Sequence, residues 1–135
     1  MDITPCVSHV SLGTNKFDLA AQFYDQVLSA LGCRRVHDFP GAIGYGHEYP
    51  EFWLQIPIDG KPAGTANGVH VGFFATSKQQ VDAFYQQALA AGAQDEGAPG
   101  LRPEYGDAYY GCFVRDLDGH KIEASFWNES VAGCC

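Results

Sequence analysis

The sequence predicts an α+β fold in which one βαβββ unit occurs twice, and three observations support this prediction. The chain has 135 residues, of which 46% are hydrophobic and 18% charged, so its size and composition fit a single globular domain. The tetrapeptide His-Val-Ser-Leu at His9 returns as His-Val-Gly-Phe at His70, an offset of 70 − 9, or 61 residues. The pair Phe-Tyr at Phe23 returns at the same offset at Phe84. Two copies indicate an internal duplication, because solenoids need at least three repeats.

The first copy is expected to begin with a strand over residues 6–13, which are rich in β-branched residues. A helix follows, with Asn15 or Asp18 as its N-cap and Gly32 just beyond its C-terminus. Apolar residues recur along this helix with helical spacing, at Leu19, Phe23, Val27, Leu28 and Leu31. Three strands then complete the unit, at residues 34–39, 43–48 and 52–56.

The second copy repeats this order, beginning with a strand over residues 69–76. Ser77 is the expected N-cap of its helix, and Gly92 ends it. The apolar stripe of this helix consists of Val81, Phe84, Tyr85 and Leu89. Strands are expected at 94–96, 109–115 and 121–127, with a turn at Asp118-Gly119. We therefore expect one domain over residues 1–135, with module one at about 5–58, a linker at about 59–67 and module two at about 68–128.

The charge distribution narrows the function classes. Sixteen acidic and eight basic residues give a net charge of −8 at pH 7. Surfaces that bind nucleic acid or anionic membranes need clustered Lys and Arg, and the only adjacent basic pair is Arg34-Arg35. The longest apolar run, residues 69–75, is too short to cross a bilayer. We expect neither nucleic acid nor a membrane among the partners.

The cysteines and the N-terminal residues favour a cytoplasmic location. The chain contains five cysteines, an odd number, without a Cys-x-x-Cys pair, which is typical of reduced thiols. The first ten residues contain neither the basic nor the apolar region of a signal peptide. Cys134 and Cys135, at the end of the chain, are expected to be thiols without a function.

Side-chain alternation along the strands predicts that three possible metal ligands lie on the strand faces directed away from the helices. The apolar residues of each strand face its helix, so His9, His70 and Glu123 face the other way. If the two copies pack with a pseudo-twofold axis, these side chains come together. Two imidazoles and one carboxylate suit Zn, Ni, Mn or Fe(II) and leave positions open for a substrate. The alternative is that both histidines are ordinary strand residues and that Glu123 is solvated.

Four sequence motifs stand out, namely His9-Val-Ser-Leu, Phe23-Tyr-Asp-Gln-Val-Leu, His70-Val-Gly-Phe-Phe-Ala and Phe113-Val-Arg-Asp-Leu-Asp-Gly-His-Lys-Ile-Glu123-Ala. They resemble motifs of the vicinal oxygen chelate superfamily, which includes glyoxalase I, extradiol dioxygenases, fosfomycin-resistance thiol transferases and bleomycin-resistance proteins. The resemblance covers residues 7–127, and in the last motif Leu117 replaces the family's usual proline. The resemblance implies two glyoxalase-like, partly closed half-barrels with helices outside and a metal ion between them. It also implies a homodimer, which is common among members.

The resemblance further implies roles for particular residues. The three candidate ligands become the ligands of one divalent metal ion, and Glu123 is also catalytic. Trp53 stands where glyoxalase I has a fourth ligand, a glutamate, and Glu51 and Gln55 are the nearest polar alternatives. This pattern is similar to that of members with three ligands. The residues expected to bind the small-molecule substrate or ligand are Trp53, Gln55, Tyr45, Tyr105, Tyr110 and Phe113.

Several other polar residues are expected at the surface. His37 and His120 neighbour charged or turn residues, and Arg115-Asp116 is expected to be a solvated pair at the turn. Arg102 is open to two interpretations, as a contact for an anionic substrate or as an ordinary surface arginine.

Functions of different classes remain open at this level. The first is a metal-dependent enzyme that acts on a small oxygen-bearing molecule, by lyase, isomerase, thiol-transfer or dioxygenase chemistry. The second is a metal-free protein that sequesters a small molecule, as bleomycin-resistance proteins do. The third is a structural or interaction role in which no ligand is bound between the half-barrels.

Overall fold

The computed structural model describes residues 5–128, and Cys134 and Cys135 lie outside this range. The chain forms two four-stranded sheets, with strand orders β1-β4-β3-β2 and β5-β8-β7-β6. The first sheet consists of β1 (Val10–Gly13), β2 (Arg34–Phe39), β3 (Ala42–Gly46) and β4 (Phe52–Gln55). The second consists of β5 (His70–Phe74), β6 (Gln94–Leu101), β7 (Tyr109–Arg115) and β8 (Lys121–Trp127). The helices are α1 (Phe17–Ser29), α2 (Lys78–Ala90) and the short 3₁₀ helix η1 (Pro103–Tyr105).

Both sheets have the same topology, which confirms the duplicated α+β fold. In each, the first strand pairs in parallel with the last, and the remaining pairs are antiparallel. The sheets are not closed into barrels, so the molecule consists of two half-barrels. Within residues 5–128, no helix is long and apolar enough to cross a membrane.

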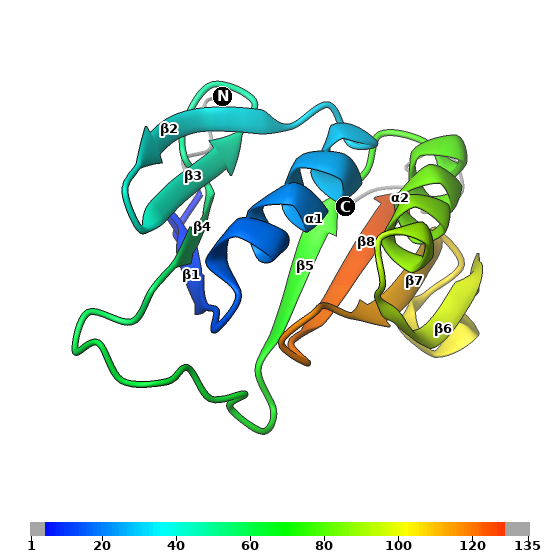
Figure 1. Ribbon diagram of the computed structural model, residues 1–135. Coiled ribbons are helices and arrows are strands. Elements are labelled where there is room, and N and C mark those ends of the chain that lie inside the picture. The colour runs from blue at the N-terminus through cyan, green and yellow to red at the C-terminus, as the bar shows by residue number, and fades with distance from the viewer. Residues whose placement is uncertain (1–4, 129–135) are drawn as a thin grey trace.

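The two units pack through their helices. Figure 1 shows α1 between the first sheet and β5, with α2 across the second sheet. The two helices contact each other, and the rings of Phe52 and Phe73 meet edge to face with centroids 5.2 Å apart. Each sheet therefore has one face against a helix and one face turned away from it, which we call the open face.

Strand alternation and helical spacing explain most of the core. Leu12 and Leu54 of the first sheet and Ile122 and Ala124 of the second are buried against the helices. The expected place of Leu19 in the α1 stripe is wrong, because its side chain is 58% exposed. Ser77 is the N-cap of α2, as predicted, since its Oγ accepts a hydrogen bond from the Gln80 amide at 3.1 Å.

The N-cap of α1 differs from the expectation. Lys16 occupies the cap position without a side-chain hydrogen bond, and neither Asn15 nor Asp18 caps the helix. Asn15 instead bridges to the linker, where its side chain bonds the backbone of Ala63 in both directions at 2.7 and 2.8 Å. A long-range contact has replaced the local one here.

A buried polar network joins the two units and corrects two expectations. His120 is buried and its Nε2 donates to the Gly13 carbonyl oxygen at 2.8 Å. Asp116 is also buried, and it accepts a hydrogen bond from the Tyr24 hydroxyl of α1. Arg115 pairs with Glu96 rather than with Asp116. The expected surface positions of His120 and Asp116 are therefore wrong, because both are buried in the contact between the units, whereas Arg115 pairs within its own unit.

Candidate functional site

The open face of the second sheet brings together two of the three predicted metal ligands. His70 Nε2 lies 2.8 Å from Glu123 Oε1, and the two side chains are 36% and 15% exposed. Register explains the contact, because β5 and β8 pair Gly72 with Glu123. Gly72 has no side chain, and a Cβ there would lie 3.5 Å from Glu123 Oε1. The carboxylate can therefore lean across Gly72 to reach His70.

Tyr109 is a site residue that the sequence analysis did not select. Its hydroxyl donates to Glu123 Oε2 at 2.6 Å from a buried position on β7. Gly111 makes this contact possible, since a Cβ at Gly111 would lie 2.1 Å from the Tyr109 hydroxyl oxygen. Burial and the neighbouring Glu123 raise the pKa of Tyr109, so the phenol stays protonated and serves as a donor.

Strand alternation explains why Tyr109 replaces Tyr110 at the site. Tyr109 and Phe113 share the open face, whereas Tyr110 faces α2 and donates to Asp82 Oδ1 at 2.7 Å. The prediction that Tyr110 contacts the substrate is therefore wrong, because its side chain lies on the helix side of the sheet. Tyr105 is half exposed and packs edge-on against Tyr109, with ring centroids 5.0 Å apart.

Tyr45 is also misplaced in the prediction. Its side chain is only 1% exposed, and its hydroxyl donates to the Ala21 carbonyl oxygen at 3.1 Å and to Asp25 Oδ1 at 2.9 Å. Both partners belong to α1. Tyr45 therefore faces the helix and not the open face of its sheet.

His9 lies apart from the other two candidate ligands within one chain. It is exposed and precedes β1, which begins at Val10, so the predicted strand over 6–13 is too long at its start. Its Nδ1 lies 3.0 Å from Ser8 Oγ. Among residues 5–128, no group of three or more His, Cys, Asp or Glu side chains could hold a metal ion.

Trp53 occupies the position in the first sheet that Glu123 occupies in the second. Ser11 pairs with Trp53 in the first sheet, as Gly72 pairs with Glu123 in the second, and Ser11 and Gly72 are 61 residues apart. Gln55 shares the face of Trp53, two residues along the same strand. Glu51 precedes β4, and its Oε2 lies 3.9 Å from His47 Nδ1.

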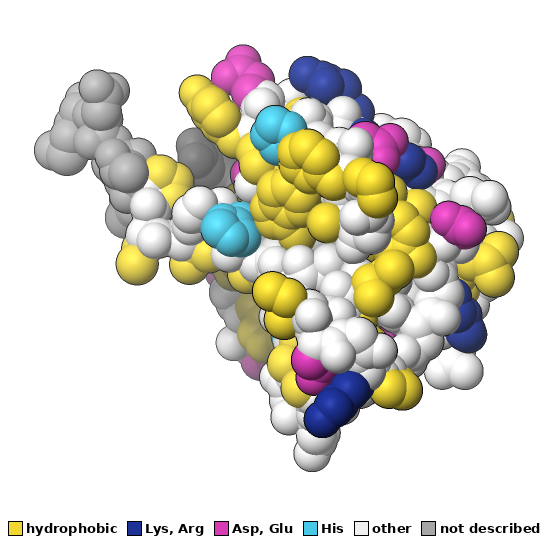
Figure 2. All heavy atoms as spheres, turned by 60° about the vertical axis from the view of Figure 1, so that its left-hand side comes forward, with side chains coloured by type: hydrophobic (Ala, Val, Ile, Leu, Met, Phe, Trp, Pro, Cys, Tyr) yellow, Lys and Arg dark blue, Asp and Glu magenta, His cyan; other side chains and the backbone are white. Residues whose placement is uncertain are grey.

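Aromatic rings cover part of the open face of the first sheet. Trp53 lies over Gly44, where a Cβ would be 3.1 Å from the indole ring. His37 and Phe39 on β2 lie parallel to the indole within 8°, with ring centroids 5.9 and 6.3 Å from it. Figure 2, which brings this side of the molecule forward, shows hydrophobic side chains gathered beside two histidines.

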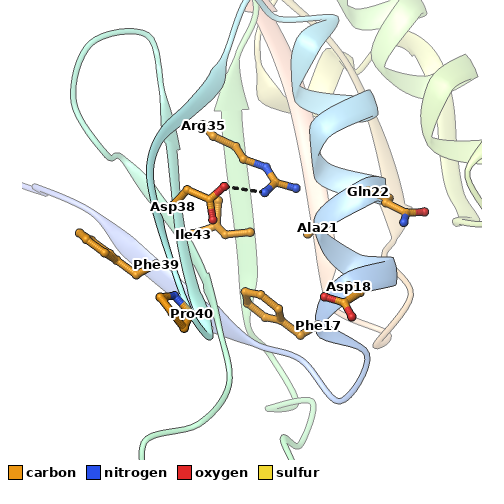
Figure 3. A pocket seen from close by; sticks show the side chains of 9 residues that line it. All are labelled: Phe17, Asp18, Ala21, Gln22, Arg35, Asp38, Phe39, Pro40 and Ile43. Atoms are coloured by element: carbon orange, nitrogen blue, oxygen red, sulfur yellow. Dashed lines mark hydrogen bonds and ion pairs between the residues drawn. The ribbon is translucent and has the colours of Figure 1, made fainter.

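A cavity of about 730 Å³ lies on the helix side of the first sheet, between α1 and the β2–β3 hairpin. Arg35 is held there by Asp25 at 2.7 Å and by Asp38 at 3.0 Å. Figure 3 shows Arg35 and Ile43 directed toward α1, and Phe39 directed away from it. None of the predicted site residues lines this cavity, so it is separate from the candidate site.

His70 and Glu123 fit two positions around a divalent metal ion. A neutral imidazole nitrogen and a carboxylate oxygen are donors that Zn, Mn, Fe(II) and Ni accept. Two ligand atoms that each lie about 2.0–2.2 Å from one ion are roughly 2.8–3.6 Å apart, and the two atoms here are 2.8 Å apart. Tyr109 donates a hydrogen bond to the other carboxylate oxygen of Glu123 and so orients it, as outer hydrogen-bond partners commonly do at metal sites.

Two βαβββ units, each with one face against a helix and one open face, define a protein of the glyoxalase-like class. The family model for the Glyoxalase/Bleomycin resistance protein/Dioxygenase superfamily matches residues 7–124, and the chain belongs to this superfamily. A glyoxalase/bleomycin resistance protein from Albidiferax ferrireducens T118 is 36% identical. The match covers 88% of this chain and 96% of that chain, with a TM-score of 0.77.

More distant structures share the fold alone. A glyoxalase-related enzyme from Fulvimarina pelagi is 20% identical over 91% of this chain and 88% of that chain, with a TM-score of 0.69. A lactoylglutathione lyase from Agrobacterium tumefaciens is 19% identical over 93% and 96% of the two chains, with a TM-score of 0.64. No curated protein sequence matches the chain.

Proposed function

We propose that the protein is a divalent-metal-dependent enzyme that acts on a small oxygen-bearing molecule in the cytoplasm. The observation that carries the proposal is the convergence of His70, Glu123 and Tyr109 on one open face. A buried tyrosine that holds a carboxylate beside an imidazole is an expected arrangement for a metal ligand and its support. Superfamily membership adds to this argument.

The third ligand of the proposed site, His9, comes from a second copy of the chain. The histidines lie at or next to β1 and β5, which are the edge strands of their sheets and pair on one side only in the described chain. Unpaired edges are surfaces on which another strand can add. Phe74 on β5 is 80% exposed and would be covered by such pairing. A homodimer would bring His9 of one copy to His70 and Glu123 of the other.

The ligand residues and the metal ion have separate tasks in this proposal. The ion supplies Lewis-acid stabilisation of negative charge on substrate oxygens. Glu123 and His70 hold the ion, and Tyr109 keeps Glu123 in place. Trp53, in the position of a fourth ligand, leaves coordination positions for substrate. Lyase, isomerase, thiol-transfer and dioxygenase reactions are all compatible with this arrangement.

Metal content of the gently purified protein tests the proposal. We expect about one divalent ion per chain in the wild type and its loss in Glu123→Ala, since the variant removes a direct ligand. Glu48→Ala is the matched control, because Glu48 is exposed and outside both sheets. A wild type that holds no metal, and whose melting temperature does not respond to added Zn, Ni, Mn or Fe(II), would contradict the proposal.

Metal-free sequestration of a small molecule is the second candidate function. The parallel rings of His37, Phe39 and Trp53 favour it, because such a surface suits stacking of a flat ligand. Tight ligand binding that chelators do not change, and that Trp53→Ala abolishes, would favour this function over the enzyme.

A further inference from the structure

Arg102 is held in a defined position beside the candidate site. Its Nη2 donates to the Ala98 carbonyl oxygen at 2.8 Å and its Nη1 to the Leu101 carbonyl oxygen at 3.1 Å. Two glycines of β6 make room for the guanidinium. A Cβ at Gly97 would lie 3.1 Å from Nη2, and one at Gly100 would lie 3.2 Å from Nη1. A larger residue at either position would displace Arg102.

A second cation lies near the same aromatic ring. Lys121 Nζ is 5.0 Å and Arg102 Cζ is 5.7 Å from the centroid of the Phe113 ring. The imidazole of His70 lies 5.6 Å from the same centroid. Phe113 pairs directly with Glu123 across β7 and β8. Both cations and the His70 imidazole therefore lie around one ring, that of the residue paired with Glu123.

Neither cation has a carboxylate partner, although the chain contains 16 acidic and eight basic residues. Arg35 and Arg115 are paired with Asp25 and Glu96, whereas no ion pair joins Arg102 or Lys121 to an acid anywhere in residues 5–128. On this face, Glu123 is already bonded to His70 and Tyr109, and Glu96 is paired with Arg115. Cations without an acidic partner keep their charge available for an anion.

The guanidinium also retains hydrogen-bonding capacity. Arginine has five N–H donors in a fixed plane, and backbone carbonyls use only two of them here. Carbonyl contacts orient the group without neutralising its charge. An oriented, uncompensated guanidinium is the arrangement that binds carboxylate and phosphate oxygens most strongly.

We propose that Arg102 and Lys121 bind an anionic group of the substrate, a carboxylate or a phosphate, beside the His70–Glu123 pair. This inference rests on the proposed function, because it assigns a substrate class to the same site. The substrate is then a small molecule with a negatively charged group at one end and oxygen atoms within reach of the metal ligands.

Anion titrations of the full-length protein test the assignment. Inorganic phosphate and acetate are titrated separately by calorimetry, into the protein as purified and after chelator treatment and dialysis. We expect Arg102→Gln to weaken binding of the preferred anion about tenfold, and Lys121→Gln to weaken it about threefold, because each removes one charge-assisted contact. Arg102→Lys, which keeps the charge but not the planar donor set, should fall between the wild type and Arg102→Gln.

Two substitutions elsewhere serve as controls. Arg34 is exposed and, like Arg102, donates to a backbone carbonyl oxygen. Lys78 lies over the Tyr110 ring, as Lys121 lies over the Phe113 ring, so both residues are matched controls outside the proposed anion site. Arg34→Gln and Lys78→Gln should leave anion affinity unchanged. Equal losses in the control and test variants would overturn the assignment, as would binding of neither anion by the wild type.

The metal measurement separates this inference from the proposed function. Anion binding that depends on Arg102 in the chelator-treated protein supports the anion site even if no metal is ever bound. Anion binding that needs the metal and is unchanged in Arg102→Gln contradicts the anion site and leaves the metal site standing. The anion that binds more tightly identifies the charged group of the substrate.

Discussion

At the scale of single residues, the hydrogen bond from Tyr109 to Glu123 is the contact that most directly determines the geometry of the candidate site. Tyr109→Phe keeps the ring and its packing but removes the donor, so one Glu123 oxygen loses its partner. We expect the dissociation constant for the divalent ion to rise about tenfold, in line with other outer-shell changes at metal sites. Calorimetric titration with Zn and Mn, beside circular dichroism to check folding, measures the effect.

Tyr105→Phe is the matched control for Tyr109→Phe. Tyr105 packs edge-on against Tyr109, and its hydroxyl makes no hydrogen bond within the described residues. Its variant should bind metal as the wild type does. If both variants lose affinity to the same degree, Tyr109 acts through packing and not through its hydroxyl.

A second prediction at this scale concerns the reactivity of Cys33. Burial and the nearby Glu51 raise the pKa of the Cys33 thiol to about 11. Because the thiolate is the nucleophile, only roughly one Cys33 in a thousand is reactive at pH 8. We expect iodoacetamide to label exposed Cys6 well before Cys33, and the Cys33 rate to rise about tenfold per pH unit toward pH 11. Peptide mass spectrometry follows both sites, and equal rates at pH 8 would contradict the prediction.

Single residues also show where sequence reasoning succeeds and where it stops. Alternation placed Phe113 and Glu123 on the open face correctly, and the same rule, applied strictly, selects Tyr109 instead of Tyr110. The contact from Asn15 to Ala63 could not be predicted, since its partner lies 48 residues away in an irregular segment. The burial of His120 depends in the same way on a carbonyl oxygen of the other unit.

At the scale of elements, α1 is tied to the β7–β8 turn by a buried hydrogen bond, and the repeat offers an internal control for it. Tyr24 of α1 donates to buried Asp116, whereas its counterpart Tyr85 of α2 donates to exposed Asp95. Tyr24→Phe leaves a buried carboxylate oxygen without its partner, which costs about 1–3 kcal/mol of unfolding free energy. Tyr85→Phe should change stability little, because water replaces the lost partner. Urea unfolding of both variants compares them, and equal destabilisation would contradict this assignment.

Element boundaries were predictable where pairing is regular and not where it is interrupted. β2, β7 and β8 have the expected limits. β6 runs from Gln94 to Leu101, beyond the expected end at 96, because its register with β7 shifts twice and lets the strand continue through Gly97 and Gly100. A bulge interrupts the alternation of apolar and polar residues from which a strand is predicted, so the end of β6 could not be predicted from the sequence.

At the scale of the whole molecule, the duplication predicts the fold of each half but not which halves share a site. Repeat markers at one offset identify two equivalent sheets, and the resemblance extends this to the superfamily. The pairing of halves depends on packing that has no local sequence pattern. In the structure, the helix sides meet within the chain, and each open face is directed away from its own helix.

This geometry leads to a prediction about subunit complementation. If His9 of one copy joins His70 of another, the single variants His9→Ala and His70→Ala each lose metal, because every site in either homodimer lacks one ligand. A mixed dimer of the two variants has one site with both substitutions and one site with neither. We therefore expect it to regain about one ion per dimer, half the wild-type content.

Co-expression with two different affinity tags, followed by purification through both, isolates the mixed dimer. Its metal content and native mass then decide how the halves combine. A site completed within one chain gives a mixed dimer without metal, since each chain lacks one of its own ligands. A species of monomer mass that still holds metal would also contradict the shared site. Recovery only in the mixed dimer would assign the two edge strands, β1 and β5, to the interface that completes the site.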